Sequence, residues 1–323
     1  MMKPVHRVNG SAADPIAGHV RFNPAKASWT LGMIGAALLF APFSFSFEAF
    51  LVFLTLTYLS LLIGHSAGLH RMMIHRTYEC HPAVEKVLIY IGVLVGMAGP
   101  FGVIRIHDVR DWAQRQAICH DFFSHRRPFL KDLWWQLTST FEFEHPPEIN
   151  IESKFADSFF YRFLERTWRL HQLMLATLLF AWGGWSFVVW GIFVRISVSI
   201  VGHWSITYVC HNPGPGRWLV QDAGVQASNI PGLGILTYGE CWHNNHHAFP
   251  ESARIGLGKG QSDPAYAFIR LLEMVGAARN IGRPRPEGER DDLIRRDAST
   301  ETAVDALSRR LEATNSLRVS SPI

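Results

Sequence analysis

The segment at residues 239–250, GECWHNNHHAFP, places three histidines within five positions. His243, His246 and His247 stand at i, i+3 and i+4, so on a helix they share one face. Neutral imidazole nitrogens on one face can converge on one or two metal ions. One such segment alone does not require metal, because a single histidine in an apolar chain is more often a hydrogen-bonded core residue.

Further histidines recur in three other segments. The sequence HRMMIHR at 70–76 supplies His70 and His75, and His65 lies five residues earlier. The second of these segments, residues 106–125, contains His107, His120 and His125, and the third, residues 202–211, contains His203 and His211. The four cysteines form no CxxC pair, and imidazole without thiolate favours iron, copper, nickel or zinc over magnesium or calcium. The whole set predicts a metal centre.

Two long apolar runs indicate membrane-spanning helices. Residues 29–64 contain one charged residue, Glu48, and residues 173–209 contain one, Arg195. Each run is about twice as long as the ~20 residues that one membrane helix needs. Each run is therefore predicted to form a hairpin of two spans.

The turns and the basic residues orient these hairpins. The first hairpin can reverse at residues 42–48 and the second at Gly183 and Gly184. Neither turn carries Lys or Arg, whereas basic residues lie before and after both runs. The positive-inside rule then places both termini and all the histidine segments in the cytoplasm. The predicted fold is an all-α integral membrane protein: two transmembrane helical hairpins, or four spans, with a cytoplasmic helical cap that carries the histidines.

A third apolar stretch, residues 87–104, is long enough to span a membrane but contains Gly92, Gly96, Gly99 and Pro100. A full crossing would place the histidines before and after it on opposite sides of the bilayer. We therefore expect this stretch to lie on the cytoplasmic leaflet or to dip into it.

Composition divides the chain into three parts. Residues 1–27 form a cytoplasmic segment without the apolar core of a signal peptide. Residues 28–278 form the membrane domain, in which 265–276 predict a short amphipathic helix. Residues 279–323 are polar and are expected to be a flexible, solvated tail. The net charge of +4 fits anionic lipid headgroups, and no motif for binding nucleic acid is present.

The segments HRMMIHR at 70–76 and WHNNHHAFP at 242–250, with the two predicted hairpins, resemble the membrane-bound fatty acid desaturases, particularly the acyl-CoA delta-9 type. The resemblance covers roughly residues 28–275. In that family, motifs called histidine boxes hold two irons, and the paired metals use dioxygen to remove two hydrogens from an acyl chain. Carried over by motif, the metal ligands are His70, His75, His107, His211, His243, His246 and His247.

The second box departs from the family pattern. The family has H-x-x-H-H, whereas residues 107–111 read HDVRD, so an arginine that cannot bind metal and an aspartate that can replace two histidines. Either the site is rebuilt from other residues, or one metal is weakly held and the activity is altered or lost. The possible substitutes are His65, His203, His120 and Asp111. The polar residues expected to orient ligand rings are Asn244, Asn245 and Glu240.

The resemblance implies a reaction that breaks unactivated methylene C–H bonds. These bonds have no acidity to exploit, so the chemistry needs a redox metal and dioxygen. The expected enzyme is an oxidoreductase that introduces a cis double bond into a long acyl chain carried by CoA, a carrier protein or a phospholipid. The chain has no dinucleotide-binding motif and no fused haem motif of the cytochrome b5 type. Electrons are therefore expected from an external ferredoxin, cytochrome or reductase.

Two alternatives remain open at this stage. A hydroxylase acting on a lipid or hydrocarbon would use the same metal platform. A metal-depleted, non-catalytic lipid-binding membrane protein would explain the altered second box.

Overall fold

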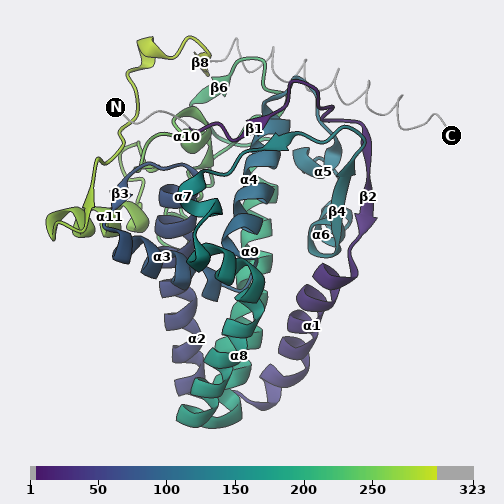
Figure 1. Cartoon of the computed structure of the whole chain (residues 1–323), viewed down its shortest axis with the longest axis vertical. Coiled ribbons are helices and arrows are strands. Elements are labelled where there is room, and N and C mark those ends of the chain that lie inside the picture. The colour runs from purple at the N-terminus through teal and green to yellow at the C-terminus, as the bar shows by residue number, and fades with distance from the viewer. Residues whose placement is uncertain (1–4, 297–323) are drawn as a thin grey trace.

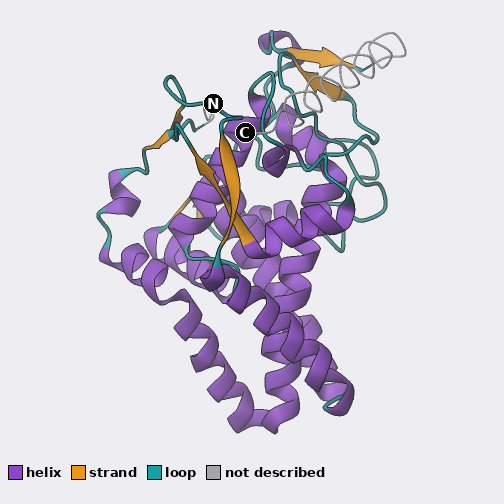
Figure 2. Ribbon diagram, turned by 90° about the vertical axis from the view of Figure 1, so that its right-hand side faces the viewer, coloured by secondary structure: helices purple, strands orange, loops and turns teal. Residues whose placement is uncertain are grey.

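The computed structural model describes residues 5–296 and is built mainly of helices. Figure 1 shows long helices running side by side in its lower half, with loops, short helices and strands above them. Figure 2 shows the same division from the side. The helices are α1 (Pro24–Phe40), η1 (Ala41–Phe43), α2 (Phe47–Leu59), η2 (Ser60–Ile74), α3 (Pro82–Leu94), α4 (Pro100–Arg115), α5 (Asp121–Ser124), α6 (Phe129–Thr138), α7 (Ser153–Ala156), α8 (Phe159–Val188), η3 (Val189–Val194), α9 (Arg195–Cys210), α10 (His243–Ala248), α11 (Pro264–Met274) and η4 (Glu287–Glu289).

The strands within the described residues are short and pair two by two, all antiparallel. The pairs are β1 (Val8–Asn9) with β5 (Glu148–Ile149), β2 (Gly18–Phe22) with β4 (Ser139–Phe143), β3 (Glu79–Cys80) with β7 (Ala278–Arg279), and β6 (Trp218–Val220) with β8 (Leu293–Arg295).

Three helical stretches of the described chain are long and apolar enough to cross a membrane: Pro24–Phe43, Phe47–Ile74 and Phe159–Cys210. Large apolar side chains on the first stretch face outward, with Leu38 74% exposed and Phe43 89% exposed. Such surfaces are unfavourable in water but are well solvated by lipid tails. The membrane character predicted from the apolar runs is confirmed.

The first two stretches begin at side-chain caps. The side chains of Asn23 and Ser46 each accept a hydrogen bond from the backbone N–H three residues further on, at 3.0 and 3.1 Å. Each cap satisfies an N–H group that the first helical turn leaves free. At the end of the first stretch, Pro42 lies in the 3₁₀ turn η1, where the predicted reversal begins.

The third stretch is interrupted at a glycine pair. Gly183 and Gly184 leave helical backbone angles, and Gly184 has a φ of +67°, in the left-handed region that favours glycine. Beyond the pair the chain packs back on itself, since a Cβ on Gly191 would lie 2.6 Å from Cδ1 of the buried Leu179. η3, which follows the pair by a few residues, packs against α8. The helix is therefore interrupted at the position where the turn is predicted.

The apolar stretch 87–104 is divided between two helices. α3 ends at Leu94 and α4 begins at Pro100, and these helices have 13 and 16 residues. Each is shorter than the ~20 residues that a membrane span needs. α3 packs directly on η2, because a Cβ on Gly64 would lie 2.3 Å from the backbone nitrogen of Gly92. This stretch therefore does not form one continuous spanning helix.

Both ends of the described chain pack onto the helices. β2 pairs with β4, and α1 begins at Pro24 rather than at residue 28. At the other end β8 pairs with β6, and Leu293 packs against Trp218. Residues 293–295 are thus paired with β6, although most of 279–296 is exposed to solvent. The assignment of 279–323 to a polar, flexible tail stays a prediction. The remainder of that tail lies outside the described residues.

The core beside the first histidine segment is apolar and tightly packed. It lies between η2, α3, α4, α8 and α11, and Met73, Ile89, Ile104 and Ile269 are each at most 1% exposed. Burying such a side chain contributes about 1.5–3 kcal/mol. The end of η2 therefore rests on a rigid support. α11 is the amphipathic helix predicted from residues 265–276.

Candidate metal centre

Four histidines from distant parts of the chain form a first cluster, which we call group 1. They are His70 in η2, His75 directly after it, His107 in α4 and His246 in α10. One ring nitrogen of each lies within 4.8 Å of those of the others. The ring centroids of His75 and His246 are 4.4 Å apart, and those of His70 and His107 are 5.2 Å apart.

The wide winding of η2 explains why His70 and His75 lie on the same side. In an α-helix, residues five apart are rotated by about 140° from each other. Here the backbone N–H of His75 donates to the His70 carbonyl at 3.0 Å, which is the i→i+5 bonding of a π-type helix. Because each residue turns through a smaller angle, positions five apart come together, and the two ring centroids are 4.8 Å apart.

Three histidines form a second cluster, which we call group 2. His211 directly follows α9, and His243 and His247 lie on α10. The Nε2 atom of His243 is 3.3 Å from that of His211 and 3.1 Å from that of His247. α10 therefore serves both groups: its i, i+4 pair belongs to group 2, and His246 belongs to group 1.

In both groups, an oxygen atom lies next to the Nδ1 atom of a histidine ring. His211 Nδ1 lies 2.7 Å from the Thr207 carbonyl oxygen, and His107 Nδ1 lies 3.2 Å from Asp108 Oδ1. An acceptor at Nδ1 keeps the proton on that nitrogen and leaves a lone pair on Nε2. These rings are therefore arranged to bind a cation through Nε2.

Glu240, which is predicted to orient a ring, lies beside His70. Its Oε2 atom is 2.7 Å from His70 Nδ1, a close approach rather than an aligned hydrogen bond. Its Oε1 atom is 3.3 Å from the Arg71 guanidinium and also accepts from the Ser66 hydroxyl. Arg71 in turn donates to Asp263 at 2.8 Å. This network ties η2 to the segment before α10 and to the start of α11.

The donor set fits a metal. Burial first, and then neighbouring histidines, hold the pKa of His75, His246 and His247 well below its ordinary value. These rings are therefore neutral, which is the form that binds metal. The Nδ1 atom of His246 is also buried without a hydrogen-bond partner in the described chain. Neutral imidazoles without thiolates suit iron, copper, nickel or zinc.

Three of the possible substitutes lie next to the groups but belong to neither. The ring centroid of His65 is 5.0 Å from that of His203 and 6.3 Å from that of His70. Asp111 Oδ2 is 3.8 Å from His107 Nδ1. Since Nδ1 is the nitrogen of His107 that also faces Asp108, Asp111 lies behind this ring rather than among the converging nitrogens.

His120 lies away from both groups. Its ring centroid is 4.5 Å from that of Phe141 and 6.1 Å from that of Trp135. Its Nδ1 accepts a hydrogen bond from the Phe122 N–H at 3.1 Å, as the N-cap of α5. The aromatic rings and the cap thus hold His120 outside both groups.

Arg110 stands at a position where the family has a second-box histidine. Its Nε atom is buried and has no hydrogen-bond partner in the described chain. After burial and the neighbouring rings of His211 and His246, the positive charge of Arg110 also lowers the pKa of His243. The guanidinium thus lies near group 2, although it offers no lone pair to a metal.

Asn244 and Asn245, which are expected to orient rings, hold loops instead. Asn245 donates to the Ile255 carbonyl and to Gln261 Oε1, at 2.9 and 2.8 Å. The side chain of Asn244 bonds to the backbone N–H groups of Arg217 and Trp218 and to the carbonyls of Trp218 and Ala227. Both residues fix the loops around α10.

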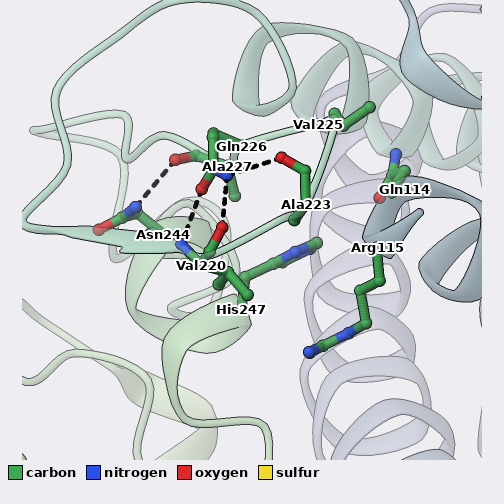
Figure 3. A pocket seen from close by; sticks show the side chains of 9 residues that line it. All are labelled: Gln114, Arg115, Val220, Ala223, Val225, Gln226, Ala227, Asn244 and His247. Atoms are coloured by element: carbon green, nitrogen blue, oxygen red, sulfur yellow. Dashed lines mark hydrogen bonds between the residues drawn. The ribbon is translucent and has the colours of Figure 1, made fainter. Parts of the chain in front are cut away.

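A small cavity of about 10 Å³ lies beside His247. Figure 3 shows the loop that lines it, closed by hydrogen bonds from Asn244 and Gln226, with Arg115 on another side. This volume has room for about one water molecule. Group 2 is therefore enclosed by packed protein on this side.

Arg7, in the N-terminal segment, is a buried residue that belongs to no recognisable sequence motif. Its guanidinium donates to two backbone carbonyls at the end of η2, at 2.8 and 2.9 Å. It also pairs with Asp108 at 3.0 Å and with Glu152 at 2.8 Å. Because Asp108 contacts His107, Arg7 links the N-terminal segment to group 1.

Glu152→Gln is expected to lower stability at neutral pH but not in acid. Burial would raise the pKa of Glu152, but hydrogen bonds from Arg7 and the backbone, together with the charges of Arg7 and Arg76, outweigh it and hold the pKa below its ordinary value of 4.5. The ionised carboxylate therefore stabilises the fold above about pH 4.5, and this contribution disappears as the pH falls through the lowered pKa. Unfolding of the metal-free protein in detergent, compared at about pH 7 and about pH 3, measures the difference. An equal loss at both pH values would contradict this assignment.

Apolar helices that end in two groups of converging, largely buried histidines define a membrane protein built to hold metal. The sequence model of the fatty acid desaturase family matches residues 45–257. The chain belongs to this family, so it is an oxidoreductase, a membrane fatty acyl desaturase. The resemblance drawn from the histidine motifs is confirmed.

Curated relatives span most of the chain. An sn-1 stearoyl-lipid 9-desaturase of Anabaena variabilis is 32% identical over 254 residues, which cover 77% of this chain and 89% of the relative. An acyl-CoA 5-desaturase of Anemone leveillei is 31% identical over 258 residues, which cover 79% of this chain and 78% of the relative. A palmitoyl-monogalactosyldiacylglycerol delta-7 desaturase of Arabidopsis thaliana is 32% identical over 254 residues, with 76% and 65% covered. Their names differ in acyl carrier and in double-bond position.

Proposed function

We propose that this chain uses two irons and dioxygen to introduce a cis double bond into a long acyl chain. The observation that carries the proposal is the gathering of seven histidines into groups 1 and 2 beside apolar helices. Membership of the desaturase family supports iron as the metal. In this proposal one iron is held by His70, His75, His107 and His246, and the other by His211, His243 and His247.

Bound in these groups, the irons would supply, with dioxygen, the oxidising power that unactivated C–H bonds require. The protein's own part is to hold the rings in place. Thr207 and Asp108 keep protons on Nδ1 of His211 and His107, and Arg71 fixes Glu240 beside His70. Burial of both groups also keeps bulk water away from the reacting chain.

The reaction needs an external electron donor. Reduction of dioxygen to two waters takes four electrons, and the two C–H bonds that are lost supply only two. The other two electrons come, in this proposal, from a ferredoxin, a cytochrome or a reductase. The acyl chain is presented on CoA, on a carrier protein or on a membrane lipid, and the names of the relatives include acyl-CoA and lipid forms.

We also propose four membrane spans, with both termini and both histidine groups in the cytoplasm. The break at Gly183 and Gly184, with Leu179 packed on Gly191, supports a hairpin in the third apolar stretch. The lack of Lys and Arg in both turns supports the orientation. The catalytic unit in this proposal is residues 28–278.

Expression in a host that lacks the corresponding unsaturated lipid tests the function. The expected product is an acyl chain that has lost two hydrogens, identified by mass spectrometry of total fatty acids. It should form in air but not when dioxygen is withheld. The empty vector provides the control.

Other products would support other functions. A hydroxylated lipid that gains one oxygen would identify a hydroxylase and contradict desaturation. An unchanged lipid profile, together with purified protein that takes up no iron, would identify a lipid-binding protein without metal chemistry.

A further inference from the structure

His125 is a buried histidine that lies beside group 2. It directly follows α5, is 2% exposed and has a φ of +55°, in the left-handed region. Its ring stacks beside that of His211, with centroids 5.6 Å apart and planes inclined by 23°. The chain thus brings a fourth imidazole alongside His211, one of the three members of group 2.

Nδ1 of His125 has a hydrogen-bond partner, whereas Nε2 has none in the described chain. Nδ1 lies 3.1 Å from Oδ2 of Asp132, which is fully buried in α6. The same carboxylate oxygen accepts a hydrogen bond from Trp204 Nε1 at 2.7 Å, which fixes it in place. His125 Nε2 is buried and has no hydrogen-bond partner in the described chain.

This arrangement matches that of a metal ligand. A histidine that binds metal through one nitrogen commonly donates the other N–H to a carboxylate or a backbone carbonyl. His211 in group 2 follows the rule through the Thr207 carbonyl, and His125 follows it through Asp132. An unpaired buried nitrogen otherwise costs stability.

Group 2 also has one imidazole donor fewer than group 1. It contains three imidazoles, and the second box supplies Arg110 and Asp111 where the family has histidines. We propose that His125 is the fourth imidazole ligand of the metal at group 2, and that Asp132 is its positioning residue. This inference rests on the proposed function for the presence of a metal at group 2.

The test counts bound iron rather than product. The full-length protein, purified in detergent, is loaded with Fe²⁺ without oxygen, and iron per chain is measured during competition with a chelator. His125→Asn removes the imidazole, and asparagine tolerates the left-handed backbone at this position. Asp132→Asn keeps the size of the side chain and removes its charge. His120→Asn is the matched control, because His120 lies outside both groups.

The wild type is expected to bind two irons, with two components in the Mössbauer spectrum. His125→Asn should bind the second iron at least about tenfold more weakly, and Asp132→Asn about 10–100-fold more weakly. The component from group 1 should stay unchanged in both variants, and His120→Asn should match the wild type. A purely structural pair of His125 and Asp132 would not produce this selective loss.

Two results would overturn the inference: variants that hold both irons as tightly as the wild type, or a wild type that binds only one. If His125→Asn does not elute as a folded species in size-exclusion chromatography, the iron affinity of Asp132→Asn provides the test instead. The proposed function fails separately. A wild type that holds two irons, loses one through His125→Asn and still forms no double bond would refute desaturation and leave the ligand assignment intact.

Discussion

Replacing His246 with alanine is expected to reduce double-bond formation to below about one hundredth of the wild-type rate, because even residues that only orient a ligand contribute 10–100-fold to metal affinity. The ring of His246 lies within 4.6 Å of that of His70 and 4.4 Å of that of His75, measured between centroids. It is the member of group 1 that α10 supplies. Its loss removes one of four donors and also uncouples group 1 from the helix that carries group 2.

The measurement is the unsaturated fraction of total fatty acids in cells that express equal amounts of each variant. His120→Ala is the matched control, since it removes a partly buried imidazole that belongs to neither group. It should keep activity close to that of the wild type. Full activity of His246→Ala would show that group 1 does not hold the reacting metal.

Arg71→Leu is expected to lower the free energy of unfolding by about 3 kcal/mol, because it leaves the buried carboxylate of Asp263 and the partly buried one of Glu240 without their cation. The Arg71 side chain is 1% exposed and Asp263 is 4% exposed. The guanidinium also donates to the backbone carbonyls of Ala253 and Tyr238. Removing it therefore loosens the segment before α10 as well as the contact with Glu240.

Thermal unfolding in one detergent, at one heating rate, measures this effect. Arg270→Leu is the control, because Arg270 pairs with Glu273 on the surface, where both side chains are about a third or more exposed. Such pairs contribute about 0–1 kcal/mol, so its unfolding temperature should hardly move. Equal shifts for the two variants would mean that the buried network does not stabilise the fold.

The sequence allows the members of the site to be predicted because metal binding restricts residue type and spacing. All seven histidines predicted as ligands lie in group 1 or group 2. The apolar runs likewise predict the long helices, since lipid requires uncharged segments of a minimum length. The five-residue spacing of His65, His70 and His75 is itself a trace of the π-type winding of η2, but it is recognisable only once the i→i+5 bonding is seen.

The division into two groups could not be predicted, because it depends on contacts between distant segments. On a helix His243, His246 and His247 share one face, yet α10 lies between the groups and divides them. The position of His120 is set by its aromatic neighbours, and no spacing rule contains that information. Arg7 contacts Asp108 and His125 stacks beside His211, both far away in the chain, so local spacing does not reveal either role.

Because His246 belongs to group 1, this metal site can be completed only late in translation. His246 is translated more than a hundred residues after His107, which corresponds to roughly ten seconds at ribosomal speeds of about 5–20 residues per second. The membrane helices that precede α10 can insert during this interval, while group 1 still lacks its last imidazole. A prematurely terminated chain would therefore reach the bilayer without a complete iron site, and uptake of iron would mark the newly finished enzyme.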